Sequence, residues 1–119
     1  MNKVIIIGVG LIGGSFAKAI RQIHPNVSIL GSDTNEAHIT EALKMGLVDK
    51  KLQDEAPLDA DLVMVSVPVD AMLNLLPNIL DKVHDDTLVI DAGSTKALVC
   101  HAVSNHRNRR NFLACHPIA

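Results

Sequence analysis

Three glycines near the start of the chain have the spacing G-x-G-x-x-G: Gly8, Gly10 and Gly13. They directly follow the apolar run 4–9 and open a segment with helical periodicity, the context in which this pattern is informative. The first glycine allows a tight turn, the second lets a pyrophosphate approach the backbone, and the third lets helix and strand pack closely. The helix N-terminus offers free N–H groups to phosphate oxygens. The pattern predicts a dinucleotide site that includes Gly8, Gly10, Leu11, Ile12 and Gly13.

An acidic residue, Asp33, follows the second predicted strand, about 20 residues beyond the glycine motif. Its carboxylate can accept hydrogen bonds from the adenosine ribose hydroxyls, and its charge would repel a 2′-phosphate. No Arg or Lys lies between Asp33 and Lys44 to offset that repulsion. We therefore predict that the cofactor is NAD and that NADP is less favoured. The alternative is that Asp33 caps the following helix, and the two roles are compatible.

A serine and a histidine that could do chemistry follow two later predicted strands, as Ser94 and His116. In open α/β sheets, ligands bind beyond the carboxyl ends of the strands. We expect both side chains at the same crevice as the cofactor, together with the cofactor-binding pair Val67 and Pro68 after a buried strand. Imidazole is the usual general base near neutral pH. The alternatives are a structural histidine at 116 and a helix N-cap at Ser94.

The elements that would position these residues alternate between short β-branched runs and longer periodic segments. Strands are predicted at 4–9, 27–31, 51–53, 62–67, 87–91 and 112–115. The intervening segments read as helices, among them 35–45 and 95–106, and Pro77 predicts a break or kink near Leu76 in the helix between 69 and 83. This alternation implies βαβ units. We predict an α/β fold of Rossmann type, with a doubly wound, mainly parallel sheet flanked by helices.

Composition limits the alternatives. The chain has 119 residues, 48% hydrophobic and 20% charged, with a formal net charge of −2, which fits one folded domain over 1–119. Near-neutral charge and only two Phe, without Tyr or Trp, argue against a nucleic-acid partner. The apolar run 4–17 is too short for a membrane span, and its glycines argue against a signal peptide. Two cysteines favour a reducing cytoplasm, and no Cys/His cluster has metal-ligand spacing.

Other features have simpler interpretations. The five remaining histidines are expected near helix ends or on solvated faces, without a functional role; they are His24, His38, His84, His101 and His106. The basic cluster of Arg107, Arg109 and Arg110 is expected at a solvated helix C-terminus, where the helix dipole favours cations.

Four stretches together resemble the nucleotide-binding half of the prephenate/arogenate dehydrogenase family: 8–15 (GVGLIGGS), 66–69 (SVPV), 91–96 (DAGSTK) and 115–119 (CHPIA). The first two are shared with many dehydrogenases of the 6-phosphogluconate dehydrogenase-like group, and the last two are more specific. The resemblance covers essentially the whole chain but only the front part of a family member. A helical domain for substrate binding and dimerisation is expected after residue 119 and is absent here.

The resemblance implies oxidative decarboxylation of prephenate to 4-hydroxyphenylpyruvate in tyrosine biosynthesis, with NAD as hydride acceptor. His116 would hydrogen-bond the 4-hydroxyl of the substrate and take up its proton, and Ser94 would help place both groups. Whether prephenate or arogenate is preferred stays open. The full-length protein is expected to be a homodimer. Because the substrate-binding arginine of the family lies in the helical domain, residues 1–119 are expected to bind NAD but to turn over prephenate poorly or not at all.

Two alternative functions remain. One is another oxidoreductase of the same group, such as a β-hydroxyacid dehydrogenase or a pyrroline-carboxylate reductase, which shares the glycine motif. The other is a non-catalytic NAD-sensing module, which would bind NAD without hydride transfer.

Overall fold

The computed structural model describes residues 1–53, 57–92 and 96–113. Its strands pair in parallel in one sheet of order β3-β2-β1-β4-β5-β6. The strands are β1 Lys3–Ile7, β2 Ser28–Ser32, β3 Lys50–Lys51, β4 Leu62–Val65, β5 Leu88–Asp91 and β6 Phe112–Leu113. The helices are α1 Leu11–Ile23, α2 Glu36–Lys44, α3 Val69–Lys82, α4 Lys96–Ala102 and the 3₁₀ turn η1 Arg109–Asn111. The predicted Rossmann-type α/β fold is confirmed.

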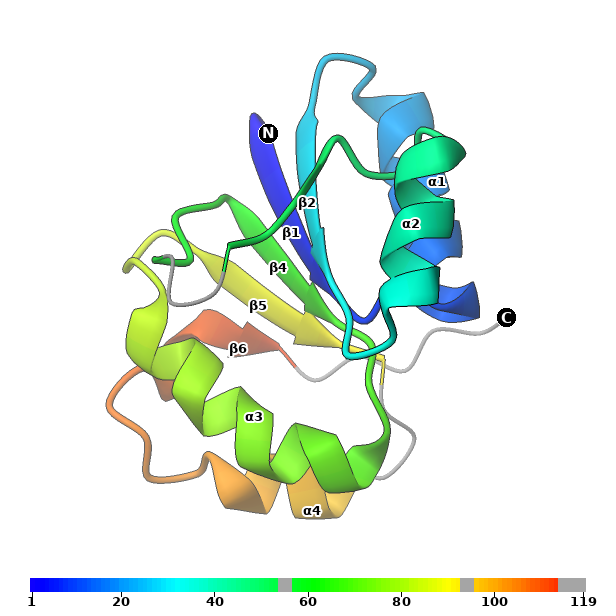
Figure 1. Ribbon diagram of the computed structural model, residues 1–119. Coiled ribbons are helices and arrows are strands. Elements are labelled where there is room, and N and C mark those ends of the chain that lie inside the picture. Colours follow the sequence, from blue (N-terminus) through cyan, green and yellow to red (C-terminus); the bar gives the residue numbers. More distant parts are fainter. Residues whose placement is uncertain (54–56, 93–95, 114–119) are drawn as a thin grey trace.

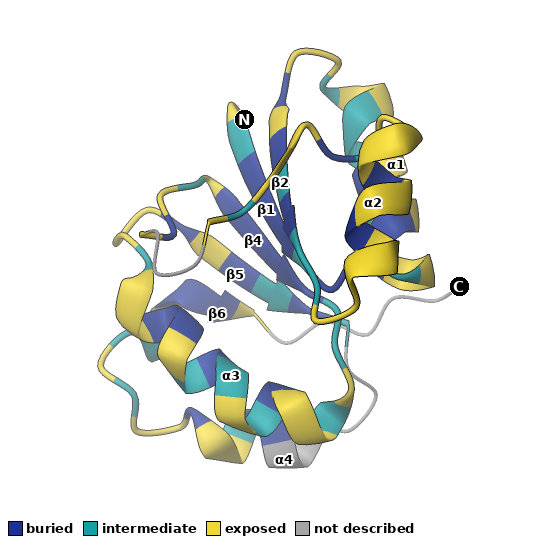
Figure 2. Cartoon of the chain, in the orientation of Figure 1, coloured by how far each residue is buried: buried dark blue, intermediate teal, exposed yellow. Residues whose placement is uncertain are grey.

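The helices cover the two faces of the sheet in pairs, α1 with α2 and α3 with α4 (Figure 1). Strand β1 supplies both cores because its side chains alternate: Val4 and Ile6 pack toward α1 and α2, and Ile5 packs toward α3 and α4. The three side chains are fully buried, and Figure 2 shows β4 dark along its length and β1 dark over its middle residues. This double coverage explains the continuous apolar runs of the sequence.

The strand order reverses at β1, which lies between β2 and β4. Backbone hydrogen bonds continue the sheet beyond the strand ends at this point. The Gly8 N–H donates to Ser32 O at 2.7 Å, and the Ser66 N–H donates to Ile7 O at 2.7 Å. A reversal of this kind opens a crevice at the carboxyl ends of the strands, where ligands of such folds bind. The glycine turn therefore lies at the topological switch point.

Helix α3 differs from the prediction, because it runs without interruption from Val69 to Lys82 with Pro77 inside it. The predicted break near Leu76 is wrong. The helix is held on the sheet by four side chains that are at most 2% exposed: Met72, Leu76, Ile79 and Leu80. Burying each contributes about 1.5–3 kcal/mol, which together exceeds the cost of about 3 kcal/mol for an interior proline.

Helix α4 ends at Ala102, before the predicted end at 106, so the basic cluster lies in the turns after the helix. Two of its members have local partners. Arg109 Nη1 donates to Phe112 O at 2.8 Å, and Arg110 Nη2 contacts Asp85 Oδ1 at 3.2 Å. The predicted helix-end location of the cluster is therefore wrong. Within the described ranges, no helix has the length and apolar character needed to cross a membrane.

The glycine turn requires the absence of side chains at two positions. Gly8 has a φ of +94°, and a Cβ there would lie 2.1 Å from Ser66 O. A Cβ on Gly13 would lie 1.9 Å from Gly8 O, although Gly13 has ordinary helical geometry. Both collisions are with backbone atoms, which cannot rotate away. The start of α1 can therefore approach the end of β1 only if both residues are glycine.

The substitution Gly13→Ala tests this close approach. Because its methyl group would displace the turn from α1, we expect the free energy of unfolding to fall by about 3 kcal/mol. The adjacent helical substitution Gly14→Ala is the control, since a Cβ there meets Leu47 Cδ1 at an ordinary 3.4 Å. It should leave stability unchanged or raise it by up to about 1 kcal/mol. Urea unfolding of the two variants measures the difference, and equal stabilities would contradict the steric argument.

Candidate functional site

The N-terminus of α1 faces the crevice without a capping side chain. Gly10 is the N-cap and makes no side-chain hydrogen bond, and the first turn contains no acidic residue. The first intrahelical bond runs from the Gly14 N–H to Gly10 O at 2.8 Å. The N–H groups of the first turn precede it and carry the positive end of the helix dipole. This end of the helix is suited to an anionic group.

Gly10 differs from Gly8 and Gly13 in what surrounds it. Among the described residues, a Cβ on Gly10 would meet only the ring of His38, at 3.8 Å and 3.9 Å, which is ordinary van der Waals contact. Protein packing therefore does not require glycine at this position. A bare backbone beside an uncapped helix N-terminus is what close approach of a phosphate requires, so the observed geometry fits a dinucleotide.

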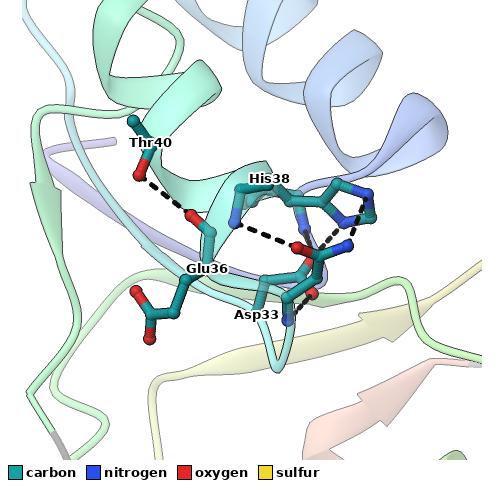
Figure 3. A network of polar contacts seen from close by, with 7 residues as sticks. Asp33, Glu36, His38 and Thr40 are labelled. Atoms are coloured by element: carbon teal, nitrogen blue, oxygen red, sulfur yellow. Dashed lines mark hydrogen bonds and ion pairs between the residues drawn. The ribbon is translucent and has the colours of Figure 1, made fainter.

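Asp33 follows β2 and turns its carboxylate back toward the glycine turn. Its Oδ2 accepts a hydrogen bond from the Val9 N–H at 2.9 Å and lies 3.1 Å from His38 Nδ1. Its Oδ1 accepts a hydrogen bond from the Asn35 N–H at 2.9 Å. The side chain is only 12% exposed. Figure 3 shows Asp33 and His38 directed toward each other at the start of α2.

These contacts determine the charge state of Asp33. Burial opposes the ionised form, but hydrogen bonds from the Asn35 N–H, from His38 and from the Val9 N–H outweigh it. The pKa of the Asp33 carboxyl is therefore held below its ordinary value of 3.8. The crevice consequently carries a fixed negative charge next to the positive end of α1.

One sequence interpretation is wrong here. The N-cap of α2 is Asn35, whose side chain accepts a hydrogen bond from the Ala37 N–H, so the capping alternative for Asp33 is wrong. For His38 the sequence predicts no functional role, and the structure adds that its imidazole contacts Asp33 and lies beside Gly10. One signal of this contact is available in the sequence: His38 lies in the first turn of the helix that follows the acidic residue. Spacing alone does not reveal which way that turn directs its side chains.

A cavity of about 390 Å³ lies on the β4 side of the glycine turn. It brings together most of the predicted cofactor residues from separate segments, and its lining residues are Gly10, Leu11, Ile12, Ser66, Val67, Pro68 and Ala92. Leu11 is 88% exposed, which is unusual for a leucine. Apolar residues therefore predominate in the lining of this cavity, which borders the uncapped N-terminus of α1, a combination suited to a small organic ligand.

A second cavity, of about 430 Å³, lies between α1 and α2. Gly10 and Leu11 line both cavities, so the glycine turn separates them. His38, Lys18 and Glu41 contribute its polar groups. The predicted site therefore extends on both sides of the turn, with Asp33 and His38 on the α2 side.

The two predicted catalytic residues, Ser94 and His116, lie outside the described residues, so their predicted meeting at the crevice stays a prediction. Cys115 lies outside them as well, and Cys100 is half-buried on α4. Among the residues that the structure describes, no three His, Cys, Asp or Glu side chains gather in a way that could hold a metal ion.

Comparison with known proteins gives a consistent result. A family described as "Prephenate dehydrogenase, nucleotide-binding domain" matches residues 16–119. A prephenate dehydrogenase of Lactococcus lactis is 37% identical over 100% of this chain and 34% of its own length. The prephenate dehydrogenase of Bacillus subtilis is 32% identical over 99% of this chain and 33% of its own length.

Among solved structures, a prephenate dehydrogenase from A. aeolicus in complex with hydroxyphenyl propionate and NAD⁺ is 30% identical. Its TM-score is 0.81, and the match covers 99% of this chain and 42% of that one. The chain thus spans about a third of the length of the curated relatives it matches.

The lowered pKa of Asp33 predicts an acid-dependent loss of stability. A depressed carboxyl pKa stabilises the fold above the unfolded value of about 4, and this contribution is lost as the pH falls through the folded value. At pH 7, Asp33→Asn should lower the free energy of unfolding by about 1–3 kcal/mol, because the charge-assisted hydrogen bonds are lost.

The difference between the wild type and Asp33→Asn should be constant above about pH 5 and should shrink below about pH 4. Thermal unfolding of both proteins across this range measures it. Asp61, whose pKa is also lowered by backbone hydrogen bonds from Asn2 and Lys3, titrates identically in both proteins and cancels. A difference that persists unchanged at low pH would contradict the assignment.

Proposed function

Because the chain belongs to the prephenate dehydrogenase family, as a nucleotide-binding domain, we propose that it forms the NAD-binding part of an enzyme that oxidises and decarboxylates prephenate. The observation that carries the proposal is the bare backbone of Gly10 at an uncapped helix N-terminus, next to the buried carboxylate of Asp33. This arrangement pairs an anion-binding group with a hydrogen-bond acceptor for a sugar, as a dinucleotide requires.

Different residues would bind different parts of the cofactor. The N–H groups of Leu11 and Ile12 would bind the pyrophosphate, and Asp33 would accept hydrogen bonds from the adenosine ribose. The cavity bounded by Ile12, Val67 and Pro68 would take the nicotinamide half. When bound, NAD supplies an acceptor for the hydride that leaves the substrate. The chain itself supplies binding and orientation, which hold the reacting atoms in line.

Negative charge at Asp33 supports a preference for NAD. A 2′-phosphate on the adenosine ribose would lie close to this carboxylate, and like charges at short range repel each other. Its lowered pKa keeps the carboxyl ionised at neutral pH. Selectivity against NADP would therefore come from repulsion as well as from the lost hydrogen bonds to the ribose.

The proton chemistry is assigned to two residues that follow strands of the sheet. His116 would accept the proton of the 4-hydroxyl of prephenate, and Ser94 would orient that hydroxyl and the imidazole. Removing the hydroxyl proton favours departure of the hydride from C4, and aromatisation of the ring then drives loss of carbon dioxide. Arogenate is the alternative substrate, with the same hydroxyl and the same ring.

The remaining parts of the proposal concern the whole protein. The relatives are about three times as long as this chain, so the rest of the substrate site and a homodimer interface would lie in the additional length. Residues 1–119 alone should bind NAD with little turnover. We assign the protein to the cytoplasm from its two cysteines, and expect neither nucleic acid nor a membrane as partner.

Isothermal titration of the chain with NAD and NADP tests the cofactor assignment. Asp33→Ala should raise the Kd for NAD by about 10- to 100-fold, because it removes charged acceptors of the ribose hydroxyls. The same change should reduce the discrimination against NADP. The control is Asp85→Ala, an exposed aspartate before β5 at the opposite edge of the sheet, which should leave both affinities unchanged. An unaltered NAD preference in Asp33→Ala would remove Asp33 from the ribose site.

The proton-transfer role is tested in the full-length enzyme that the proposal requires. His116→Asn should lower the turnover of prephenate by about 10²–10⁴-fold, the usual contribution of a general base, with nearly unchanged NAD affinity. His101→Asn, an exposed histidine on α4, is the matched control. Assays with arogenate and with 3-hydroxy acids separate the related oxidoreductases. Wild-type turnover in His116→Asn would remove His116 from the mechanism, whereas NAD binding without any hydride transfer would favour an NAD-sensing module.

A further inference from the structure

His38 connects the start of α2 with the glycine turn. Its ring is 48% exposed, and one edge lies 3.8–3.9 Å from the position of a Cβ on Gly10. Its Nδ1 lies 3.1 Å from Asp33 Oδ2. The imidazole thus lies between the bare backbone assigned to the phosphates and the carboxylate assigned to the ribose. It also borders the cavity between α1 and α2.

The hydrogen bonds around the ring define its protonation pattern. Asn35 Oδ1 accepts the Ala37 N–H at 2.9 Å, which directs the Asn35 amide nitrogen toward His38 Nε2 at 3.5 Å. Nε2 is therefore the acceptor, and Nδ1 carries the hydrogen that it donates to Asp33. The N-cap of α2 orients the histidine, and the histidine orients the carboxylate.

Among the residues that the structure describes, the other contacts of Asp33 come from the backbone. The Val9 N–H and the Asn35 N–H each bind one carboxylate oxygen. The His38 side chain shares Oδ2 with Val9, so it restricts rotation of the carboxylate. A ribose diol needs acceptors in a fixed orientation, because misplaced acceptors lose much of their hydrogen-bond energy.

We propose that His38 is a positioning residue for Asp33 and a determinant of nucleotide selectivity in the adenosine half of the site. This inference rests on the proposed NAD-binding function. The His38 Nδ1 contact at 3.1 Å holds the Asp33 carboxylate in place for the ribose hydroxyls. The ionised carboxylate, fixed in this position, repels a 2′-phosphate.

The selectivity for NAD over NADP should therefore depend on His38 at a fixed pH. The other charged groups that border the same cavity are Lys18 on α1 and Glu41 on α2, and Asp33 itself contacts the ring. Replacing His38 leaves these three groups in place. A change in selectivity would consequently report on the position of the Asp33 carboxylate.

Two substitutions test the positioning role. His38→Asn keeps an N–H donor near the position of Nδ1, whereas His38→Leu removes the donor and preserves helix propensity. In binding titrations of the chain, His38→Leu should raise the Kd for NAD by about 3- to 10-fold. His38→Asn should restore most of this affinity. His101→Leu, on the opposite face of the sheet, is the control and should leave binding unchanged.

The selectivity is read from the ratio of the Kd for NADP to the Kd for NAD at one pH. In His38→Leu this ratio should be about 2- to 5-fold smaller than in the wild type, because a misplaced carboxylate loses hydrogen bonds to the ribose diol of NAD that NADP does not make in full. His38→Asn should keep most of the wild-type ratio. Melting temperatures of the three proteins show whether any loss of affinity comes from unfolding.

The outcomes are distinct. If the wild type binds NAD but both variants have its affinity and its NADP-to-NAD ratio, the role of His38 is wrong while the proposed function stands. If both variants lose affinity equally and keep the wild-type ratio, His38 supports the fold and does not select the nucleotide. If the wild type does not bind NAD, the proposed function and this inference fail together.

Discussion

The approach of helix α1 to strand β1 depends on two positions that carry no side chain. A methyl group on Gly13 would lie 1.9 Å from Gly8 O, and one on Gly8 would lie 2.1 Å from Ser66 O. Because both positions are glycine, the ends of β1 and β4 and the first turn of α1 lie within van der Waals distance of one another. The crevice at the switch point exists because the backbone itself forms its floor, and the orientation of the helix dipole toward the ligand follows from this packing.

Electrostatics complements this steric constraint. A partly buried carboxylate is unfavourable unless it is hydrogen-bonded, and Asp33 accepts the Val9 N–H from the glycine turn and the Asn35 N–H from the start of α2. The Val9 N–H belongs to the glycine turn, so the turn and the acidic residue stabilise each other. The same turn that offers N–H groups to an anion thereby holds an ionised acceptor beside it. A dinucleotide needs both groups in this order along its length, a phosphate binder and then a sugar binder.

Much of the fold could be predicted because parallel strands covered on both faces leave a strong signal in the sequence. The strands and the Rossmann topology follow from apolar runs such as 62–67 and from the alternation with helical segments. The unbroken course of α3 through Pro77 could not be predicted from the sequence. The local cost of the proline is offset by the burial of Met72, Leu76 and their neighbours, which only tertiary packing reveals.

The sequence predicts some residues of the candidate site but not others. The glycines and Asp33 have fixed spacing, since they follow strands that the topology brings together. His38 was missed because its contact depends on the rotation of α2, which the Asn35 cap determines and no spacing rule encodes. The prediction for Ser94 and His116 stays untested, although β5 and β6 are parallel neighbours with Ile90 opposite Leu113.

That pairing has a consequence for the family-specific chemistry. Strands β5 and β6 end at the same edge of the sheet as β1 and β4, at which Gly8 and Ser66 meet. The glycine turn and Asp33 are features that any dinucleotide-binding domain of this type needs, so they say little about the substrate. Substrate chemistry requires groups on the nicotinamide side, beyond β4 and β5, where the exposed Leu11 and the cavity around Val67 lie. Cofactor selection and substrate selection are therefore assigned to opposite sides of one glycine turn, and a substitution at Asp33 or His38 should alter the first without altering the second.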